Sequence, residues 1–185
     1  MEIIKTGFEG LYVLQTKAFK DERGGFQKLF NHDFFKDNGL DVDFKEFYYS
    51  LNKKNVVRGM HFQIPPMDHT KVVYVSAGRI IDVSLDIRKK SPTYGKAFFT
   101  ELNAEDGRYL YIPKGFAHGF VSLEDGSICN YAQTTCYDRE RDCGIDVNSF
   151  GFDWGVENPI RSGRDLEFPD LKDFDSPFNT ELSLY

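Results

Sequence analysis

Hydrophobic and polar residues alternate strictly along residues 81–88, within a predicted strand over residues 79–88. At every second position the side chain is apolar: Ile81, Val83, Leu85 and Ile87. Each of these residues is followed by a polar or charged one: Asp82, Ser84, Asp86 and Arg88. Because side chains of an extended chain point alternately to its two sides, this period of two residues predicts a β-strand with one apolar face.

Shorter apolar stretches recur along the chain and are separated by turn signals such as Glu105-Asp106-Gly107. They predict strands over residues 11–15, 46–51, 56–63, 71–76, 97–102, 108–112, 117–123 and 127–135. Many short strands at regular spacing are typical of an antiparallel sandwich or barrel. We therefore expect an all-β fold.

Helical signals are few. Residues 32–38 form one candidate helix, with Asn31 as its N-terminal cap. The last forty residues are rich in Pro, Asp and Phe, and we expect them to wrap the barrel as coil and short helix. The chain has 185 residues and shows neither a linker nor an internal repeat. We therefore expect a single domain over residues 1–185.

Charge and composition narrow the function classes. The net charge of -6 argues against a nucleic-acid binder that works through a broad basic face. No apolar run is long enough to span a membrane, and the first five residues lack the features of a secretory signal. Cys129, Cys136 and Cys143 are seven residues apart, which matches no common zinc pattern. We expect reduced thiols in a cytoplasmic protein.

His61 lies in one of the predicted strands. On a regular strand Gly59, His61 and Gln63 would share one face. Arg58, Met60 and Phe62 would share the other face. A polar set on the inner face of a barrel is typical of a ligand site, because buried polar groups need partners. A surface histidine or one with a purely structural hydrogen bond is the alternative.

His118 ends a Pro-x-Gly-x-x-His pattern that resembles the second sequence motif of the cupin barrels, where this histidine is a metal ligand. The first cupin motif, a His-x-His with a downstream Glu, is absent around His61. A stable site for a transition metal needs about three or four protein ligands, and His69 is the one further histidine nearby. We expect no metal. A histidine without metal indicates proton transfer, with a tyrosine as a possible proton donor. The residues alone leave open which Tyr and Asp lie near His61.

The chain resembles the dTDP-4-dehydrorhamnose 3,5-epimerase family. The matching segments occur in family order and are residues 21–24, 53–63, 82–88, 91–95 and 111–120. The resemblance implies a cupin-type antiparallel β-barrel (a jelly roll) with a few short helices. It also implies a homodimer with exchanged strands, a nucleotide-diphosphate sugar as substrate, and no cofactor.

The family chemistry assigns roles to four residues. A 4-keto group acidifies the hydrogens at C3 and C5 of the sugar. The resemblance implies that His61 removes a proton as a base and that Asp165 orients it. It further implies that Lys71 stabilises the enolate oxygen and that Tyr131 returns a proton on the other face.

The resemblance also assigns substrate-binding positions. Arg23 and Arg58 match the diphosphate contacts, and the family residue at Arg23 reaches into the neighbouring subunit's site. The other positions are Phe26, Glu46, Tyr48, Gln63, His118, Asp142 and Arg164. Simpler roles exist for some of them: Arg23 could form a surface ion pair, and Asp82 could buttress His118 by a hydrogen bond.

Several of these positions depart from the family pattern. Glu46 and Tyr48 stand where the family usually has Gln-x-Asn, and Asp142 and Arg164 stand where Glu and Lys are common. The segment around Phe26 also differs. The family that the chain resembles includes relatives acting on GDP-linked 4-keto heptoses for capsule synthesis, and these departures favour that branch over a dTDP-linked 4-keto-6-deoxyhexose. In either case Glu46 places a negative acceptor beside the substrate, for sugar hydroxyls or a guanine edge.

Other functions remain open on the sequence. The protein could epimerise C3 alone, although Tyr131 favours both positions. It could move the keto group between C3 and C4, or bind a sugar without catalysis. A metal-dependent cupin oxygenase or isomerase is a further class.

Overall fold

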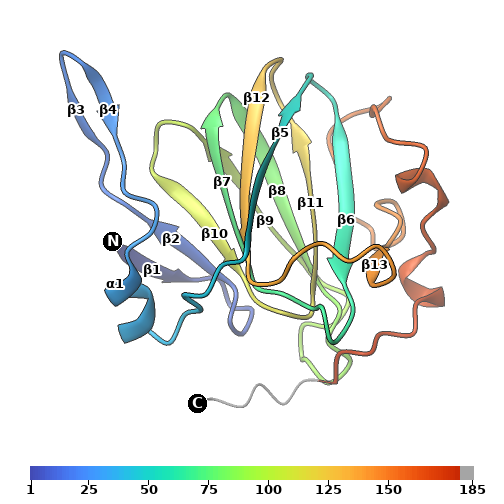
Figure 1. The fold of residues 1–185 in the computed structure, drawn as a ribbon. Coiled ribbons are helices and arrows are strands. Elements are labelled where there is room, and N and C mark those ends of the chain that lie inside the picture. The colour runs from blue at the N-terminus through green and yellow to red at the C-terminus, as the bar shows by residue number, and fades with distance from the viewer. Residues whose placement is uncertain (180–185) are drawn as a thin grey trace.

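Two antiparallel sheets face each other in the computed structural model, which describes residues 1–179 (Figure 1). The six-stranded sheet has the order β1 (Glu2–Lys5), β2 (Tyr12–Gln15), β10 (Arg108–Ile112), β7 (Lys71–Ala77), β12 (Ser127–Gln133) and β5 (Glu46–Asn52). The five-stranded sheet has the order β13 (Asp142–Gly144), β6 (Val57–Gln63), β11 (Phe116–Ser122), β8 (Arg79–Asp86) and β9 (Ala97–Asn103). This arrangement confirms the predicted all-β fold.

The nine predicted strands are all present, and their ends differ from the predicted ones by two residues at most. Four further strands were not predicted: β1, β13 and the hairpin of β3 (Phe19–Asp21) and β4 (Gly24–Phe26). Each of these strands has only three or four residues, which is too short for a period of two to stand out.

Helix α1 (His32–Asp37) is the predicted helix. The Oδ1 atom of Asn31 accepts a hydrogen bond from the backbone N–H of Phe34 at 2.9 Å, which confirms the predicted cap. Phe35 is buried and packs its ring edge against Tyr111 of β10. The helix thereby covers part of the outer face of the six-stranded sheet.

Strand β8 has the predicted alternation, but both of its faces are buried. Its apolar residues, such as Val83 and Leu85, point away from the barrel interior and pack beneath the C-terminal segment. The polar side chains of Asp82, Ser84 and Asp86 point the other way and have no exposed surface. The interior of the barrel is therefore partly polar, which prepares it for a ligand rather than for a purely apolar core.

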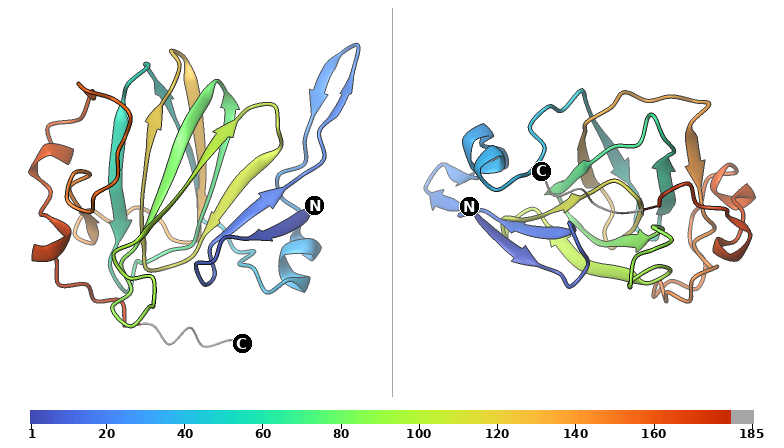
Figure 2. Two further views of the ribbon diagram at one scale, coloured as in Figure 1. Left: turned by 180° about the vertical axis from the view of Figure 1, so that it is seen from behind. Right: turned by 90° about the horizontal axis from the view of Figure 1, so that it is seen from below.

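The C-terminal segment lies along the outer face of the five-stranded sheet as coil with two short 3-10 helices, η1 (Asp165–Glu167) and η2 (Leu171–Asp173) (Figure 2). Trp154 and Phe178 are buried there against the sheet. This confirms the predicted wrapping through residue 179. Residues 180–185 of the predicted domain lie outside the described residues. No helix among residues 1–179 has the length and apolar character needed to cross a membrane.

A bulge in β6 changes the predicted facing of its residues. His61 lies opposite His118 of β11, but Arg58 lies opposite Phe120, so β6 has one residue more than its partner between these two pairs. The prediction that Arg58 shares a face with Met60 and Phe62 is therefore wrong, because the extra residue reverses the alternation. Arg58 shares the inner side with His61. Gly59 occupies the bulge at φ +131°, and a Cβ there would lie 2.6 Å from the Cα of Gly119.

Candidate active site

Strand register places two rows of side chains on the inner face of the six-stranded sheet. Where β12 and β5 pair, Gln133 lies opposite Glu46, and Tyr131 lies opposite Tyr48. Where β12 and β7 pair, Gln133 also lies opposite Lys71. Lys71, Gln133 and Tyr131 are buried, whereas Tyr48 on the edge strand β5 has 41% of its surface exposed. The interior therefore opens along the β5 edge.

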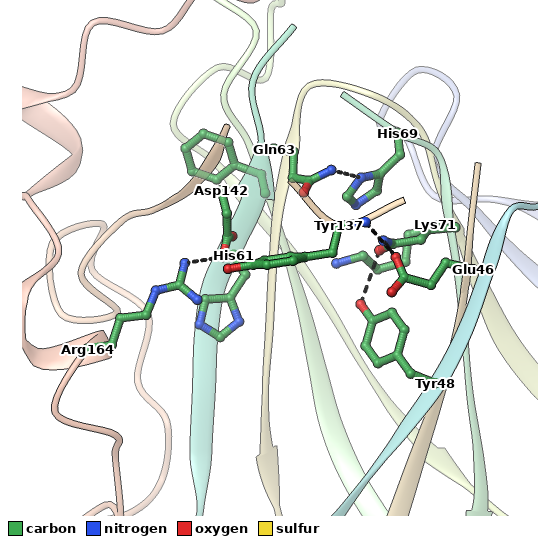
Figure 3. A pocket seen from close by; sticks show the side chains of 11 residues that line it. Glu46, Tyr48, His61, Gln63, His69, Lys71, Tyr137, Asp142 and Arg164 are labelled. Atoms are coloured by element: carbon green, nitrogen blue, oxygen red, sulfur yellow. Dashed lines mark hydrogen bonds and ion pairs between the residues drawn. The ribbon is translucent and has the colours of Figure 1, made fainter. Parts of the chain in front are cut away.

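A cavity of about 270 Å³ lies between these rows and β6 (Figure 3). The residues that line it are Glu46, Tyr48, His61, Phe62, Gln63, His69, Lys71, Gln133, Tyr137, Asp142 and Arg164. A narrow extension continues toward His118. Seven of the residues predicted for the site from the sequence thus line one cavity: Glu46, Tyr48, His61, Gln63, Lys71, Asp142 and Arg164.

His61 is paired with Asp165 in this cavity. The Nε2 atom of His61 lies 2.9 Å from Oδ1 of Asp165, and the backbone N–H of Gly59 donates to Oδ2 at 3.2 Å. Burial raises the pKa of Asp165, but the hydrogen bonds from His61, Gly59 and Ser162 outweigh it, so the net pKa is lowered. An ionised Asp165 accepts from Nε2–H, which leaves the lone pair of the neutral imidazole on Nδ1. The side chain of His61 is 32% exposed and that of Asp165 is 5% exposed.

His118 forms a second pair with Asp82, deeper in the barrel. Its Nε2 atom lies 2.7 Å from Oδ2 of Asp82, and both residues are buried. Burial lowers the pKa of His118, although Asp82 acts in the opposite direction. The expected buttressing of His118 by Asp82 is therefore present. Oδ1 of Asp82 has no hydrogen-bond partner within the described part of the chain.

Lys71 is the buried cation of the site. Its Nζ atom lies 5.9 Å from the ring centroid of Tyr131. Burial lowers the pKa of Lys71 to about 8, although the negative charge of Asp82 opposes this shift. Lys71 is therefore mostly protonated at neutral pH and is desolvated, which strengthens its attraction for a developing oxyanion.

Tyr131 lies on β12, in the sheet opposite that of His61, and is not among the residues that line the cavity. Its ring stacks on that of Tyr48, with the centroids 4.6 Å apart and an interplanar angle of 17°. Its hydroxyl lies 3.3 Å from Oγ of Ser50. Burial holds the pKa of Tyr131 well above its usual value, so the phenol keeps its proton at neutral pH. Its edge also faces His118, at 6.0 Å between ring centroids.

The rim of the cavity on the β13 side carries a charged pair. Nη2 of Arg164 lies 2.7 Å from Oδ2 of Asp142, and the guanidinium lies 5.1 Å from the ring centroid of Phe168. Phe168 in turn packs edge-on against His61. Arg164 thus presents a partly exposed cation beside the base.

Four predicted binding residues do not line this cavity: His118 lines only its extension, and Arg23, Phe26 and Arg58 lie outside both. Arg58 is exposed, and its Nε donates to Oδ1 of Asn52 at 2.8 Å. Arg23 and Phe26 lie on the β3–β4 hairpin, which projects away from the barrel (Figure 1). The side chain of Arg23 is 85% exposed and pairs with Asp21 at 2.6 Å.

Four lining residues were not predicted from the sequence as binding groups: Phe62, His69, Gln133 and Tyr137. Gln133 follows Tyr131 by two positions, so the alternation of the predicted strand already placed it on the same face. His69 hydrogen-bonds Thr135 at 3.2 Å, and burial lowers its pKa to about 3, so it is neutral. Tyr137 lies in the loop after β12, where no periodic signal exists. Among residues 1–179, no three His, Cys, Asp or Glu side chains are grouped so that they could hold a metal ion.

Comparison with known proteins decides the family. The sequence pattern described as dTDP-4-dehydrorhamnose 3,5-epimerase matches residues 5–173. The chain belongs to the dTDP-4-dehydrorhamnose 3,5-epimerase family. It is 38% identical over 178 residues to the dTDP-4-dehydrorhamnose 3,5-epimerase of Shigella flexneri, with 95% of this chain and 98% of the relative covered.

Solved structures agree with this assignment. The structure of a dTDP-6-deoxy-D-glucose-3,5-epimerase from Legionella pneumophila, in complex with dTDP-4-keto-L-rhamnose, has a TM-score of 0.89 at 33% identity and 94% coverage of both chains. A 3'-monoepimerase from Streptomyces bikiniensis, in complex with dTDP-quinovose, has a TM-score of 0.85 at 25% identity, with 90% of this chain and 86% of that chain covered. As a member of the epimerase family, the protein is an isomerase with the predicted cupin-type fold.

Proposed function

We propose that the protein epimerises C3 and C5 of a nucleotide-diphosphate-linked 4-keto sugar without a cofactor. The observation that supports this most is the pairing of His61 with Asp165 on one side of a cavity whose other side holds Lys71. A hydrogen next to a keto group becomes acidic when the resulting enolate oxygen is stabilised. His61 and Lys71 line the cavity and supply a base and a buried cation, and the proton-bearing phenol of Tyr131 lies beside Lys71, behind the lining residues.

In this mechanism Nδ1 of His61 removes the proton at C3 or C5. Asp165 keeps the opposite nitrogen protonated and stabilises the imidazolium that forms. The ammonium of Lys71 stabilises the negative charge on the C4 oxygen of the enolate. Tyr131, on the opposing sheet, returns a proton to the other face of the sugar, which inverts the carbon.

Hydrogen exchange tests this proposal directly. The protein is incubated in D₂O with dTDP- and GDP-linked 4-keto-6-deoxy sugars, and deuterium uptake at each carbon is followed by proton NMR. We expect uptake at both C3 and C5, and a loss of about 10²- to 10⁴-fold in the His61→Asn variant because a general base is removed. His32→Asn, on the exposed start of α1, is the matched control and should keep the wild-type rate.

Other outcomes would change the proposal. Uptake at C3 alone would make the protein a C3 epimerase, the activity named for the Streptomyces bikiniensis neighbour. Binding without exchange would indicate a non-catalytic sugar-binding cupin. Stoichiometric iron or manganese in the active purified protein would contradict the cofactor-free mechanism.

The exchange rates measured with the dTDP-linked and the GDP-linked sugar also test which nucleotide the protein prefers. The relatives named above are named for dTDP-linked sugars, which supports dTDP. The departures at Glu46 and Tyr48 support a GDP-linked heptose, and this substrate and its use in capsule synthesis stay a prediction. The cytoplasmic location also stays a prediction.

We also propose that the protein is a homodimer in which the β3–β4 hairpin enters the partner's cavity. The hairpin carries exposed aromatic side chains at Phe19 and Phe26, and Arg23 finds only Asp21 as a partner among the described residues. The outer face of the edge strand β5 is also exposed and apolar: Phe47, Tyr49 and Leu51.

Complementation between two inactive variants tests the exchange. A mixed dimer of Arg23→Ala and His61→Asn protomers has one site with both His61 and an arginine from the partner. We expect activity to reappear when the two variants are unfolded and refolded together. If Arg23 served its own subunit, mixing would restore nothing. Sedimentation equilibrium checks the oligomeric state of each sample.

A further inference from the structure

The wall of the cavity formed by β5 and β12 contains a directional chain of hydrogen bonds. The hydroxyl of Tyr48 donates to Oε1 of Gln133 at 3.2 Å. Nε2 of Gln133 donates to Oε2 of Glu46 at 2.8 Å. The backbone N–H of Tyr137 donates to the same Oε2 at 2.7 Å. Figure 3 shows Glu46 and Tyr48 on one side of the cavity, across from His61.

The direction of this chain is fixed by its members. A backbone N–H can only donate, so Oε2 of Glu46 is an acceptor toward Tyr137. A flipped Gln133 amide would bring its oxygen to 2.8 Å from Glu46, where two acceptors repel each other. Two donors therefore occupy Oε2. The second oxygen, Oε1, accepts no hydrogen bond from the described residues, and Glu46 lines the cavity.

This geometry limits what Glu46 can bind. Recognition of a guanine edge by a carboxylate uses both oxygens for two parallel N–H groups, and here the two lone pairs of Oε2 are already engaged. A diphosphate is repelled by the negative charge. A single neutral O–H or N–H donor fits the one available oxygen.

We infer that Glu46 is a specificity-determining residue that accepts one hydrogen bond from a neutral donor of the substrate through Oε1. The inference rests on the proposed function and specifies the substrate chemistry at this wall. The donor is either a sugar hydroxyl or one N–H of the base. Tyr48 and Gln133 are positioning residues, because they hold Glu46 without needing to touch the substrate.

The variant Glu46→Gln tests this inference cleanly. Its amide oxygen can replace Oε2 toward Gln133 and Tyr137, so the wall stays intact and the melting temperature should be unchanged. Its NH₂ group then faces the cavity and meets the substrate's donor with another donor. Glu157→Gln removes the same charge at an exposed position outside the cavity and serves as the control.

Binding is measured by calorimetry with dTDP, dTDP-glucose, GDP and GDP-mannose, which contain no 4-keto group and do not react. In the series that binds the wild type, we expect Glu46→Gln to bind the nucleotide sugar roughly 10- to 100-fold more weakly, the usual value of a charge-assisted hydrogen bond. Glu157→Gln should bind like the wild type. If Glu46→Gln loses as much affinity for the nucleotide alone as for the nucleotide sugar, the donor belongs to the nucleotide. If its affinity for the nucleotide alone is unchanged, the donor belongs to the sugar.

Two binding results would overturn the inference. Unchanged binding would show that Glu46 does not face a donor, and tighter binding would show that it faces an acceptor such as phosphate. If the wild type bound neither series, the proposed function would fail, and this inference with it. Absence of deuterium exchange despite normal binding would contradict the catalytic proposal alone.

Discussion

Two histidine–aspartate pairs lie side by side in this protein and differ in access, although not in composition. His61 and His118 are opposite each other on β6 and β11, and each lies within 3 Å of a carboxylate: 2.9 Å to Asp165 and 2.7 Å to Asp82. His61 is partly exposed and lines the cavity, whereas His118 and Asp82 are buried.

The difference shows that burial gives two chemically identical pairs different roles. A pair can exchange protons with a substrate only where the substrate can reach it. The buried pair instead acts through its charge, because Asp82 supports the protonated form of Lys71. We therefore expect substitutions of the accessible pair to change the chemical step, and substitutions of the buried pair to change pH dependence and stability.

Of the substitutions that separate the two pairs, Asp165→Asn should lower the rate of hydrogen exchange the most. Asparagine keeps the size of the side chain but removes the charge that fixes the tautomer of His61, so we expect exchange at C3 and C5 to fall about 10²- to 10⁴-fold. The affinity for unreactive nucleotide sugars should change little. Asp37→Asn, at the exposed end of α1, is the control. A rate within a factor of a few of wild type would show that Asp165 does not orient the base.

Lys71 gives the next largest effect, because it lines the cavity with His61 and is stabilised in its charged form by Asp82. Its pKa of about 8 in the free protein predicts that kcat/KM falls as the pH rises through 8, since the neutral amine no longer stabilises the enolate. Lys71→Met should lower kcat about 10²- to 10³-fold, the usual cost of losing one oxyanion-stabilising group, and remove this pH limb. A variant with an unchanged pH profile would assign the limb to another group.

The same substitution should stabilise the fold. Between pH 8 and 10.5 the folded protein binds fewer protons at Lys71 than the unfolded chain does, so stability rises over this window. Below pH 8 the full cost of burying the charge applies. At pH 7 we expect Lys71→Met to raise the free energy of unfolding by on the order of 3 kcal/mol, measured by denaturant titration. A decrease would show that the buried charge is well compensated.

Asp82→Asn should have the smallest effect on the rate. Removing this negative charge lowers the pKa of Lys71 further, so the alkaline limb of kcat/KM moves to lower pH. Each unit of that shift changes the protonated fraction about tenfold above the pKa. The weakened bond to His118 should cost about 1–3 kcal/mol of stability. An unchanged alkaline limb would contradict electrostatic coupling between Asp82 and Lys71.

The two pairs also differ in how much of each could be predicted from the sequence. Asp82 and His118 lie on strands that the alternation predicted, and the expected hydrogen bond between them is present. The partner of His61 came only from family resemblance, since 104 residues separate Asp165 from it and no local pattern joins them. The bulge at Gly59 was not predicted, because a strand assignment assumes an unbroken period.

The sequence by itself determined which residues share a face of an unbroken strand, where the turns lie and to which family the chain belongs. These follow from side-chain alternation, backbone preference and the order of the family's motifs along the chain. The sequence could not determine which face of a strand lies inside the barrel, because alternation alone does not say which face is buried. In β8 the polar face points inward, and in β5 the apolar outer face stays exposed. Only the packing of the two sheets and of the C-terminal segment decided that, and with it which histidine meets the substrate. The reason is physical: burial, desolvation and charge pairing depend on neighbours that are distant in sequence.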